Sequence, residues 1–155
     1  MDPTTEMRCF KAAKITPEMT EVLKERARKG RLWSVIATSA AKSGHPGGAL
    51  SSMDIYMTLL ASANVTPDNS DCMERDRIVI SHGHTSAGYY SALAAYGFFK
   101  PEEMYPNFRR TCSPFQGHVE REVPGVDWGT GNLGQGLAAG VGFAIAARAR
   151  GSNAR

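Results

Sequence analysis

The stretch from Gly129 to Gly142 constrains the fold of this chain more than any other. It reads GTGNLGQGLAAGVG and leads into a predicted helix that runs from Leu133 to about Arg150. Glycine and alanine occupy nearly every face of this helix, and each internal glycine costs a helix about 1 kcal/mol relative to alanine. Close packing of the helix against neighbours on all sides is the simplest way to offset this cost in stability. The sequence therefore predicts a helix buried in a deep interior.

The same stretch contains the spacing G-x-G-x-x-G at Gly129, Gly131 and Gly134. A dinucleotide site also needs a buried strand leading into the first glycine and an acidic residue about 20 positions later. Proline and glycine interrupt residues 123–128, and no acidic residue follows Asp127. A dinucleotide site is therefore disfavoured.

Composition limits the class of protein. The chain is 42% hydrophobic and 21% charged, as ordinary soluble proteins are, and its net charge of +3 is too small and too spread out to indicate nucleic acid. The longest apolar run, residues 137–147, is shorter than a bilayer span, so no membrane partner is expected. Three cysteines without C-x-x-C spacing favour free thiols and a cytoplasmic location.

A long helix is predicted near the N-terminus. Thr16 is a capping residue, and Pro17 follows it in the first turn. Gly30 is a point at which this helix could divide in two, and Gly44 is a candidate C-terminal stop. Residues 1–15 are expected to form a flexible arm.

A convincing buried strand is predicted at Arg77–Ser81, a short β-branched run. A glycine turn at residues 82–86 and a small-residue helix over about Ala87–Tyr96 follow it. This order of strand, turn and helix is typical of α/β proteins, whose ligands collect at the carboxyl ends of strands. The expected fold class is therefore α/β, with residues 1–155 forming one incomplete domain.

All four histidines lie in predicted loops that contain glycine: His45, His82, His84 and His118. Imidazole donates hydrogen bonds to phosphate oxygens and moves protons near neutral pH, so four such loops together favour a site. A zinc site made by His82 and His84 with Cys72 or His118 is a competing interpretation, but the histidine spacing lacks a second close pair.

Four motifs occur in order along the chain: SGHPG at 43–47, DRIVISHGH at 76–84, QGH at 116–118 and GNLGQG at 131–136. In this combination the chain resembles the amino-terminal, thiamine diphosphate-binding part of transketolases, and in particular the N-terminal subunit of split transketolases, apparently shortened. The resemblance extends from about Arg31 to Gly151.

The resemblance implies helices around a mainly parallel sheet, of which only the first strand or strands are present here. It implies transfer of a two-carbon ketol unit between sugar phosphates, with thiamine diphosphate and Mg²⁺ as cofactors. It also implies a partner, the C-terminal transketolase subunit, and a homo- or hetero-oligomer. The isolated chain is expected to be inactive.

By position, His84 resembles the family histidine near the cofactor diphosphate, while His45 and His118 resemble those that line the substrate channel. These three are the candidate catalytic residues. The residues expected to contact the cofactor are His84, Gly131, Asn132 and Leu133.

This sequence departs from the family pattern in three respects. His82 stands where Asn or Lys is usual, and residues 128–130 (WGT) replace small hydroxyl residues. The Gly-Asp-Gly motif that holds Mg²⁺ in the family is absent, since no Asp precedes a glycine, so no metal ligand is predicted in this chain. A non-catalytic, transketolase-like interaction or regulatory subunit is the alternative function.

Overall fold

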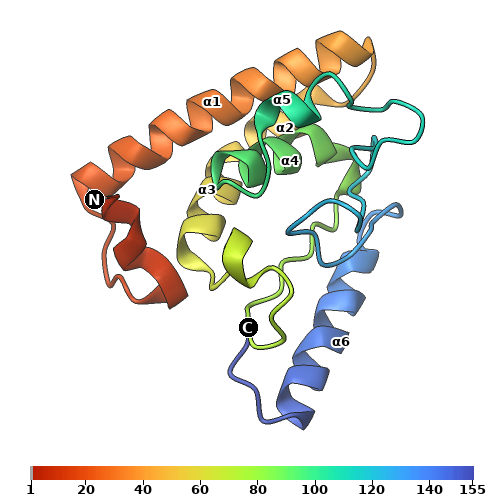
Figure 1. Cartoon of the computed structure of the whole chain (residues 1–155). Coiled ribbons are helices and arrows are strands. Elements are labelled where there is room, and N and C mark those ends of the chain that lie inside the picture. The colour runs from red at the N-terminus through yellow and green to blue at the C-terminus, as the bar shows by residue number, and fades with distance from the viewer. Residues whose placement is uncertain (1) are drawn as a thin grey trace.

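The computed structural model describes residues 2–155, and the elements are helices joined by loops (Figure 1). Three are short 3-10 helices and six are α-helices. In chain order they are η1 (Pro3–Phe10), α1 (Pro17–Ala41), α2 (Pro46–Ser51), α3 (Met53–Ser62), η2 (Pro67–Asn69), η3 (Gly83–Thr85), α4 (Ser86–Ala95), α5 (Pro101–Met104) and α6 (Gln135–Ala149).

The centre of the core is α4, which packs against α1, α2 and α3. Residues 86–94 of α4 are all buried, and this explains why the helix is made of small side chains and two tyrosines. Where α2 crosses α4, a side chain at Gly88 would approach the Cα of Ala49 to 2.8 Å. The glycine therefore permits the close approach of the two helices. The small-residue helix predicted at about Ala87–Tyr96 is confirmed.

The long N-terminal helix is confirmed, but its predicted division at Gly30 is wrong. Helix α1 is continuous, and Thr16 caps it through a hydrogen bond from the Met19 amide. A Cβ at Gly30 would lie 2.6 Å from the sulfur of Met53, so this glycine makes room for α3. The helix ends at Ala41, and Lys42, rather than Gly44, adopts the left-handed conformation that follows it.

The core-facing stripe of α1 is composed mainly of small residues. Ser34 is fully buried, and its hydroxyl donates to the Gly30 carbonyl at 2.8 Å. Three larger apolar residues of the same helix are exposed instead: Leu32, Val35 and Ile36. The buried face of α1 is therefore not its most hydrophobic face. Because α1 packs closely against α3 and α4, only small side chains fit between the helices here.

The predicted N-terminal arm contains η1, which packs on α1 and α3. Met7 is buried, and the Arg8 guanidinium donates to carbonyls at the end of α3, including that of Leu60 at 2.8 Å. Arg26 of α1 forms an ion pair with Asp2. These contacts fasten residues 2–10 to the helices, while the flexibility expected of residues 1–15 stays a prediction.

The strand predicted at Arg77–Ser81 does not form, and the part of the chain that the structure describes contains no β-strand. The segment has the buried alternation of a strand, since Ile78 and Ile80 are 6% and 5% exposed. A strand also requires a neighbouring strand joined to it by a ladder of backbone hydrogen bonds, and none lies beside this segment within residues 2–155. The mainly parallel sheet expected from the sequence is therefore not observed.

Helix α6 forms as predicted, but the expected deep burial is wrong. Only Gly136 of this helix is buried, and Leu137, Val141 and Ile145 are 75%, 52% and 64% exposed. Figure 1 shows α6 standing at one side of the helical core. No atom lies within 4 Å of a Cβ placed at Gly140 or Gly142, so the surface that would cover this part of α6 is not among residues 2–155.

Candidate functional site

Backbone hydrogen bonds bring three of the four motifs side by side. The Val119 amide donates to the Gly83 carbonyl at 3.1 Å, and the Thr130 amide donates to the Val119 carbonyl at 3.0 Å. Gly83 also packs directly on Thr130, because a Cβ at this glycine would lie 2.6 Å from the Thr130 carbonyl oxygen. The loops that carry His84, His118 and Gly131 therefore meet.

The loop before α2 completes this cluster. The rings of His45 and His84 lie edge to face with their centroids 5.4 Å apart, and the rings of His84 and His82 are 6.1 Å apart. Gly48 permits this approach, since a Cβ there would lie 2.8 Å from the Thr85 methyl group. His45 is exposed, whereas His82 and His84 are half-buried. Three imidazoles thus converge on one side of the molecule.

His82 is anchored to the core through a buried hydroxyl. Its Nε2 lies 3.0 Å from the Tyr56 hydroxyl, which lies 2.6 Å from the Thr85 hydroxyl. The Thr85 hydroxyl in turn donates to the His82 carbonyl oxygen at 2.9 Å. Burial, and then the nearby His84, lower the pKa of His82, so its ring is neutral at pH 7. Burial raises the pKa of Tyr56, which keeps its proton.

The glycine turn after Thr130 is open. Residues 131–134 are all exposed, and no atom lies within 4 Å of a Cβ placed at Gly131 or Gly134. Gly134 has φ of 87°, a left-handed conformation that favours glycine. Thr130 holds the turn, since its hydroxyl donates to the Ile80 carbonyl at 2.8 Å. The segment Gly131–Leu133 is therefore open to solvent.

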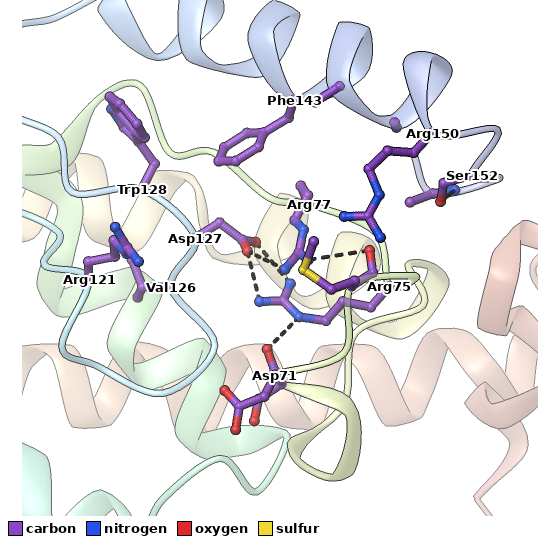
Figure 2. A pocket seen from close by; sticks show the side chains of 15 residues that line it. Asp71, Arg75, Arg77, Arg121, Val126, Asp127, Trp128, Phe143, Arg150 and Ser152 are labelled. Atoms are coloured by element: carbon purple, nitrogen blue, oxygen red, sulfur yellow. Dashed lines mark hydrogen bonds and ion pairs between the residues drawn. The ribbon is translucent and has the colours of Figure 1, made fainter.

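A buried ion pair fixes the segment that leads into this turn. Asp127 accepts two hydrogen bonds from Arg75, at 2.7 and 3.0 Å, and one from Arg77 at 3.1 Å (Figure 2). It also accepts from the Ile78 amide at 2.9 Å. The side chains of Arg75 and Asp127 are each 4% exposed. This pair therefore locks residues 126–130 onto the segment that precedes the histidines.

A cavity of about 590 Å³ lies between this ion pair and helix α6. Figure 2 shows Phe143 of α6, and Arg150 just after the helix, on one side of the cavity, with Asp127 across from them. The Phe143 and Trp128 rings meet edge to face at 6.2 Å. The cavity separates α6 from the body of the chain at the helix's C-terminal end.

The predicted site residues differ in how closely they meet. His45 and His84 are in contact, while the exposed His118 joins the cluster through its backbone, and its carbonyl accepts from Tyr90 at 2.9 Å. Among residues 2–155 no group of three or more His, Cys, Asp or Glu side chains is placed to hold a metal ion. The competing zinc site is therefore not formed, and Cys72 carries a free thiol.

A sequence model of the family described as "Transketolase, thiamine diphosphate binding domain" matches residues 22–154. The chain belongs to the transketolase family. Transketolase 1 of Escherichia coli K12 is 42% identical over 125 residues, which are 79% of this chain and 19% of that protein. The transketolase of Kluyveromyces lactis is 41% identical over 116 residues, which are 75% of this chain and 17% of that protein.

Solved transketolase structures resemble this chain as well. The Campylobacter jejuni enzyme gives a TM-score of 0.72 at 39% identity and covers 83% of this chain and 20% of its own length. The Pichia stipitis enzyme in complex with sedoheptulose 7-phosphate gives a TM-score of 0.69 at 36% identity. The match covers 81% of this chain and 19% of that enzyme. The chain therefore spans about a fifth of the length of the relatives it matches.

Sequence reasoning missed the residues that support the site. The sequence indicated no role for Tyr56, for Thr85 or for the pair of Arg75 and Asp127. A tyrosine in an otherwise aliphatic stripe and an Asp two residues before Gly129 are the only signals the sequence offers. Their partners lie 29 and 52 residues away, so only folding reveals them.

None of the helices within residues 2–155 has the length and apolar character that a membrane-spanning helix requires.

Proposed function

We propose that this chain supplies one wall of a thiamine diphosphate-dependent transketolase site that transfers a two-carbon ketol unit between sugar phosphates. Convergence of the loops bearing His45, His84, His118 and Gly131 supports this most directly. The matched family model and the sugar phosphate bound to the Pichia stipitis enzyme support the same class of reaction. The remaining walls come from a partner polypeptide, such as a C-terminal transketolase subunit in a homo- or hetero-oligomer.

The residues present fit the organic part of the cofactor. The exposed backbone of Gly131 and Leu133, with Asn132 between them, leaves room for a flat ring, since no atom occupies the space beside Gly131. His84 is half-buried and can donate to an oxygen of the diphosphate. When bound, thiamine diphosphate supplies a carbanion that accepts and releases the ketol unit.

His45 and His118 fit the substrate side of the same site. Both rings are exposed, so each can hydrogen-bond a hydroxyl or carbonyl oxygen of a sugar phosphate and transfer a proton to or from it. The His82 ring, 6.1 Å from the His84 ring, is neutral because burial lowers its pKa, so it places no positive charge beside His84. These residues bind and orient the substrate, while the reactive carbon belongs to the cofactor.

The residues present do not fit Mg²⁺. A hard cation needs several carboxylate or carbonyl oxygens, and no cluster of acidic side chains occurs within residues 2–155. Asp127 is already committed to two arginines. The metal ligands are therefore proposed to belong to the partner polypeptide, and the isolated chain is expected to be inactive.

A chimera tests the proposal. The section of E. coli transketolase 1 aligned with this chain is replaced by residues 22–154, and ketol transfer from a ketose phosphate to an aldose phosphate is measured with thiamine diphosphate and Mg²⁺. We expect activity that His84→Ala and His45→Ala reduce at least about 100-fold, as for loss of an acid-base group. Ile55→Ala, at a 67% exposed position of α3, is the matched control and should retain activity. A folded chimera without turnover would refute the proposal.

The absence of an acidic cluster in residues 2–155 favours a second candidate, a transketolase-like regulatory subunit without catalysis. Calorimetry separates the two. The catalytic proposal predicts that the chimera binds thiamine diphosphate in the presence of Mg²⁺ and that His84→Ala weakens this binding. A regulatory subunit predicts no cofactor binding in the folded chimera.

A further inference from the structure

The hydroxyl of Thr85 belongs to a series of hydrogen bonds whose direction follows from counting protons. A carbonyl oxygen can only accept, so the Thr85 hydroxyl, 2.9 Å from the His82 carbonyl oxygen, uses its single proton there. The Tyr56 hydroxyl lies 2.6 Å from the same Thr85 oxygen. Because the Thr85 proton is already used, Tyr56 is the donor in this second bond.

The Tyr56 hydroxyl in turn decides which nitrogen of His82 carries a proton. Burial raises the pKa of Tyr56, so the hydroxyl keeps its one proton and donates it to Thr85. At the 3.0 Å contact with Nε2 of His82, the tyrosine oxygen is therefore the acceptor, and Nε2 is the donor. The Ser52 hydroxyl, 3.4 Å from Nε2, is a weaker second neighbour.

A proton on Nε2 leaves the other ring nitrogen of His82, Nδ1, as an acceptor. The ring is neutral at pH 7, since burial, and then His84, lower its pKa. Within residues 2–155 no hydrogen bond engages Nδ1, and the one buried side-chain N or O atom without a partner is the Ser86 hydroxyl. Nδ1 therefore reaches solvent, on a ring that lies 6.1 Å from the ring of His84.

We propose that Tyr56 and Thr85 hold His82 in the Nε2–H form, so that Nδ1 accepts a hydrogen bond from a ligand hydroxyl and disfavours an unprotonated oxyanion at that position. An oxyanion placed there meets a lone pair without a proton, whereas a sugar hydroxyl can donate. His82 is thus a specificity residue, and Tyr56 and Thr85 are positioning residues. That the ligand is a sugar phosphate rests on the proposed function, whereas the tautomer rests on the hydrogen bonds alone.

NMR of the ¹⁵N-labelled 155-residue chain at pH 8 tests the tautomer, because the ¹⁵N shifts of the ring nitrogens differ according to which of them carries the proton. We expect His82 in the Nε2–H form. In Tyr56→Phe, which lacks the acceptor, the Nε2 proton should exchange with water at least about tenfold faster. Ser52→Ala is the matched control and should keep this proton protected. A ring in the Nδ1–H form, or equal exchange in Tyr56→Phe, would overturn the proposal. If Tyr56→Phe does not fold, the tautomer in the original chain decides.

Reversing the direction of the hydrogen bonds tests the selectivity. Thr85→Val keeps the shape of the side chain and removes the hydroxyl, while the His82 carbonyl keeps the Thr85 amide as a partner at 3.0 Å. In a Ser52→Ala background, whose lost side chain makes no capping hydrogen bond, Nε2 is then the acceptor that remains for the Tyr56 proton. The His82 ring of this double variant should therefore change to the Nδ1–H form.

Sulfate, which carries no proton at pH 8, is the probe, and its binding is followed by the ring signals of His82 and His84. We expect the double variant to bind sulfate at least about tenfold more tightly than Ser52→Ala alone, because Nδ1 now donates. Equal affinity, or no measurable binding by either protein, would overturn the selectivity. If circular dichroism shows the double variant unfolded, His82→Asn, whose amide can donate, replaces it with the same expected direction. Ketol transfer is not measured, so loss of turnover in the chimera refutes only the proposed function.

Discussion

The backbone amide of Val119 donates to the carbonyl oxygen of Gly83 across 3.1 Å. This bond joins residues 36 positions apart and places the loop of His118 beside the loop of His84. Because the Val119 carbonyl accepts from Thr130, the same short bridge also holds the turn at Gly131. The geometry of the proposed site therefore depends on a few backbone contacts. The effect of breaking these contacts on stability can be measured in the isolated chain.

Gly83→Ala tests the contact between the histidine loop and the glycine turn. The added Cβ would lie 2.6 Å from the Thr130 carbonyl oxygen, and backbone cannot move aside cheaply. We expect a loss of about 1–3 kcal/mol in the free energy of unfolding, measured by urea denaturation. Gly47→Ala is the control, since no atom lies within 4 Å of a Cβ there. Equal stability of Gly83→Ala and the original chain would contradict this packing.

Two glycines of α6 should respond in opposite directions to alanine. A Cβ at Gly136 would lie 2.8 Å from the Cα of Ser81, so Gly136→Ala should destabilise the docking of α6. Gly140 has no atom within 4 Å of the added carbon, so Gly140→Ala should stabilise the chain by up to about 1 kcal/mol through helix propensity. Thermal unfolding followed by circular dichroism measures both. A stabilising Gly136→Ala would show that α6 does not rest on Ser81.

Asp127→Asn tests the buried ion pair. The substitution leaves the Arg75 guanidinium, in a side chain only 4% exposed, without a charged partner. Breaking such a pair from one side costs about 3–5 kcal/mol, so urea denaturation should show a large loss of stability. Glu25→Gln removes an exposed partner of Arg28 and should have no measurable effect. Similar stabilities for the two variants would mean that Asp127 is accessible to water.

His82 gives the chain a stability that depends on pH. Because burial lowers its pKa below the ordinary 6.5, the unfolded chain binds a proton before the folded chain does. The contribution of His82 is therefore neutral above the unfolded pKa and becomes destabilising as pH falls from about 6.5 toward the folded pKa. NMR titration of the imidazole should show the low pKa. His82→Asn should flatten this part of the stability profile, and an unchanged profile would contradict the assignment.

Local sequence signals predicted several elements correctly. Thr16 and Pro17 specify the start of α1 because capping and proline geometry act within one turn. The helix predicted from Leu133 to about Arg150 corresponds to α6, and the helix predicted at about Ala87–Tyr96 corresponds to α4. The short helix α2 was missed, since its first residue, Pro46, directly follows His45, which was predicted to lie in a loop. Instead, this proline occupies the first position of the helix, where its missing N–H has no cost.

The site was predicted only in part. Motif order indicated that His45, His84, His118 and Gly131 belong together, and the structure brings their loops side by side. Their catalytic and cofactor-binding roles stay predictions, as do those of Asn132 and Leu133. The supporting hydrogen bond between Tyr56 and His82 could not be predicted, because it joins a helix to a loop 26 residues later.

The sequence by itself determined the family, the order of the motifs and the ends of individual helices, because these depend on residue identity and on contacts within a few positions. Tertiary structure alone decided which face of α1 is buried, how close Gly83 lies to Thr130, and whether residues 77–81 form a strand. A strand needs hydrogen bonds from a second segment, and burial needs a surface that covers the helix. Strand formation and helix burial both depend on the segments that pack nearby. Within residues 2–155 the segment 77–81 has no neighbouring strand, and most of the glycine-rich α6 has no surface that covers it.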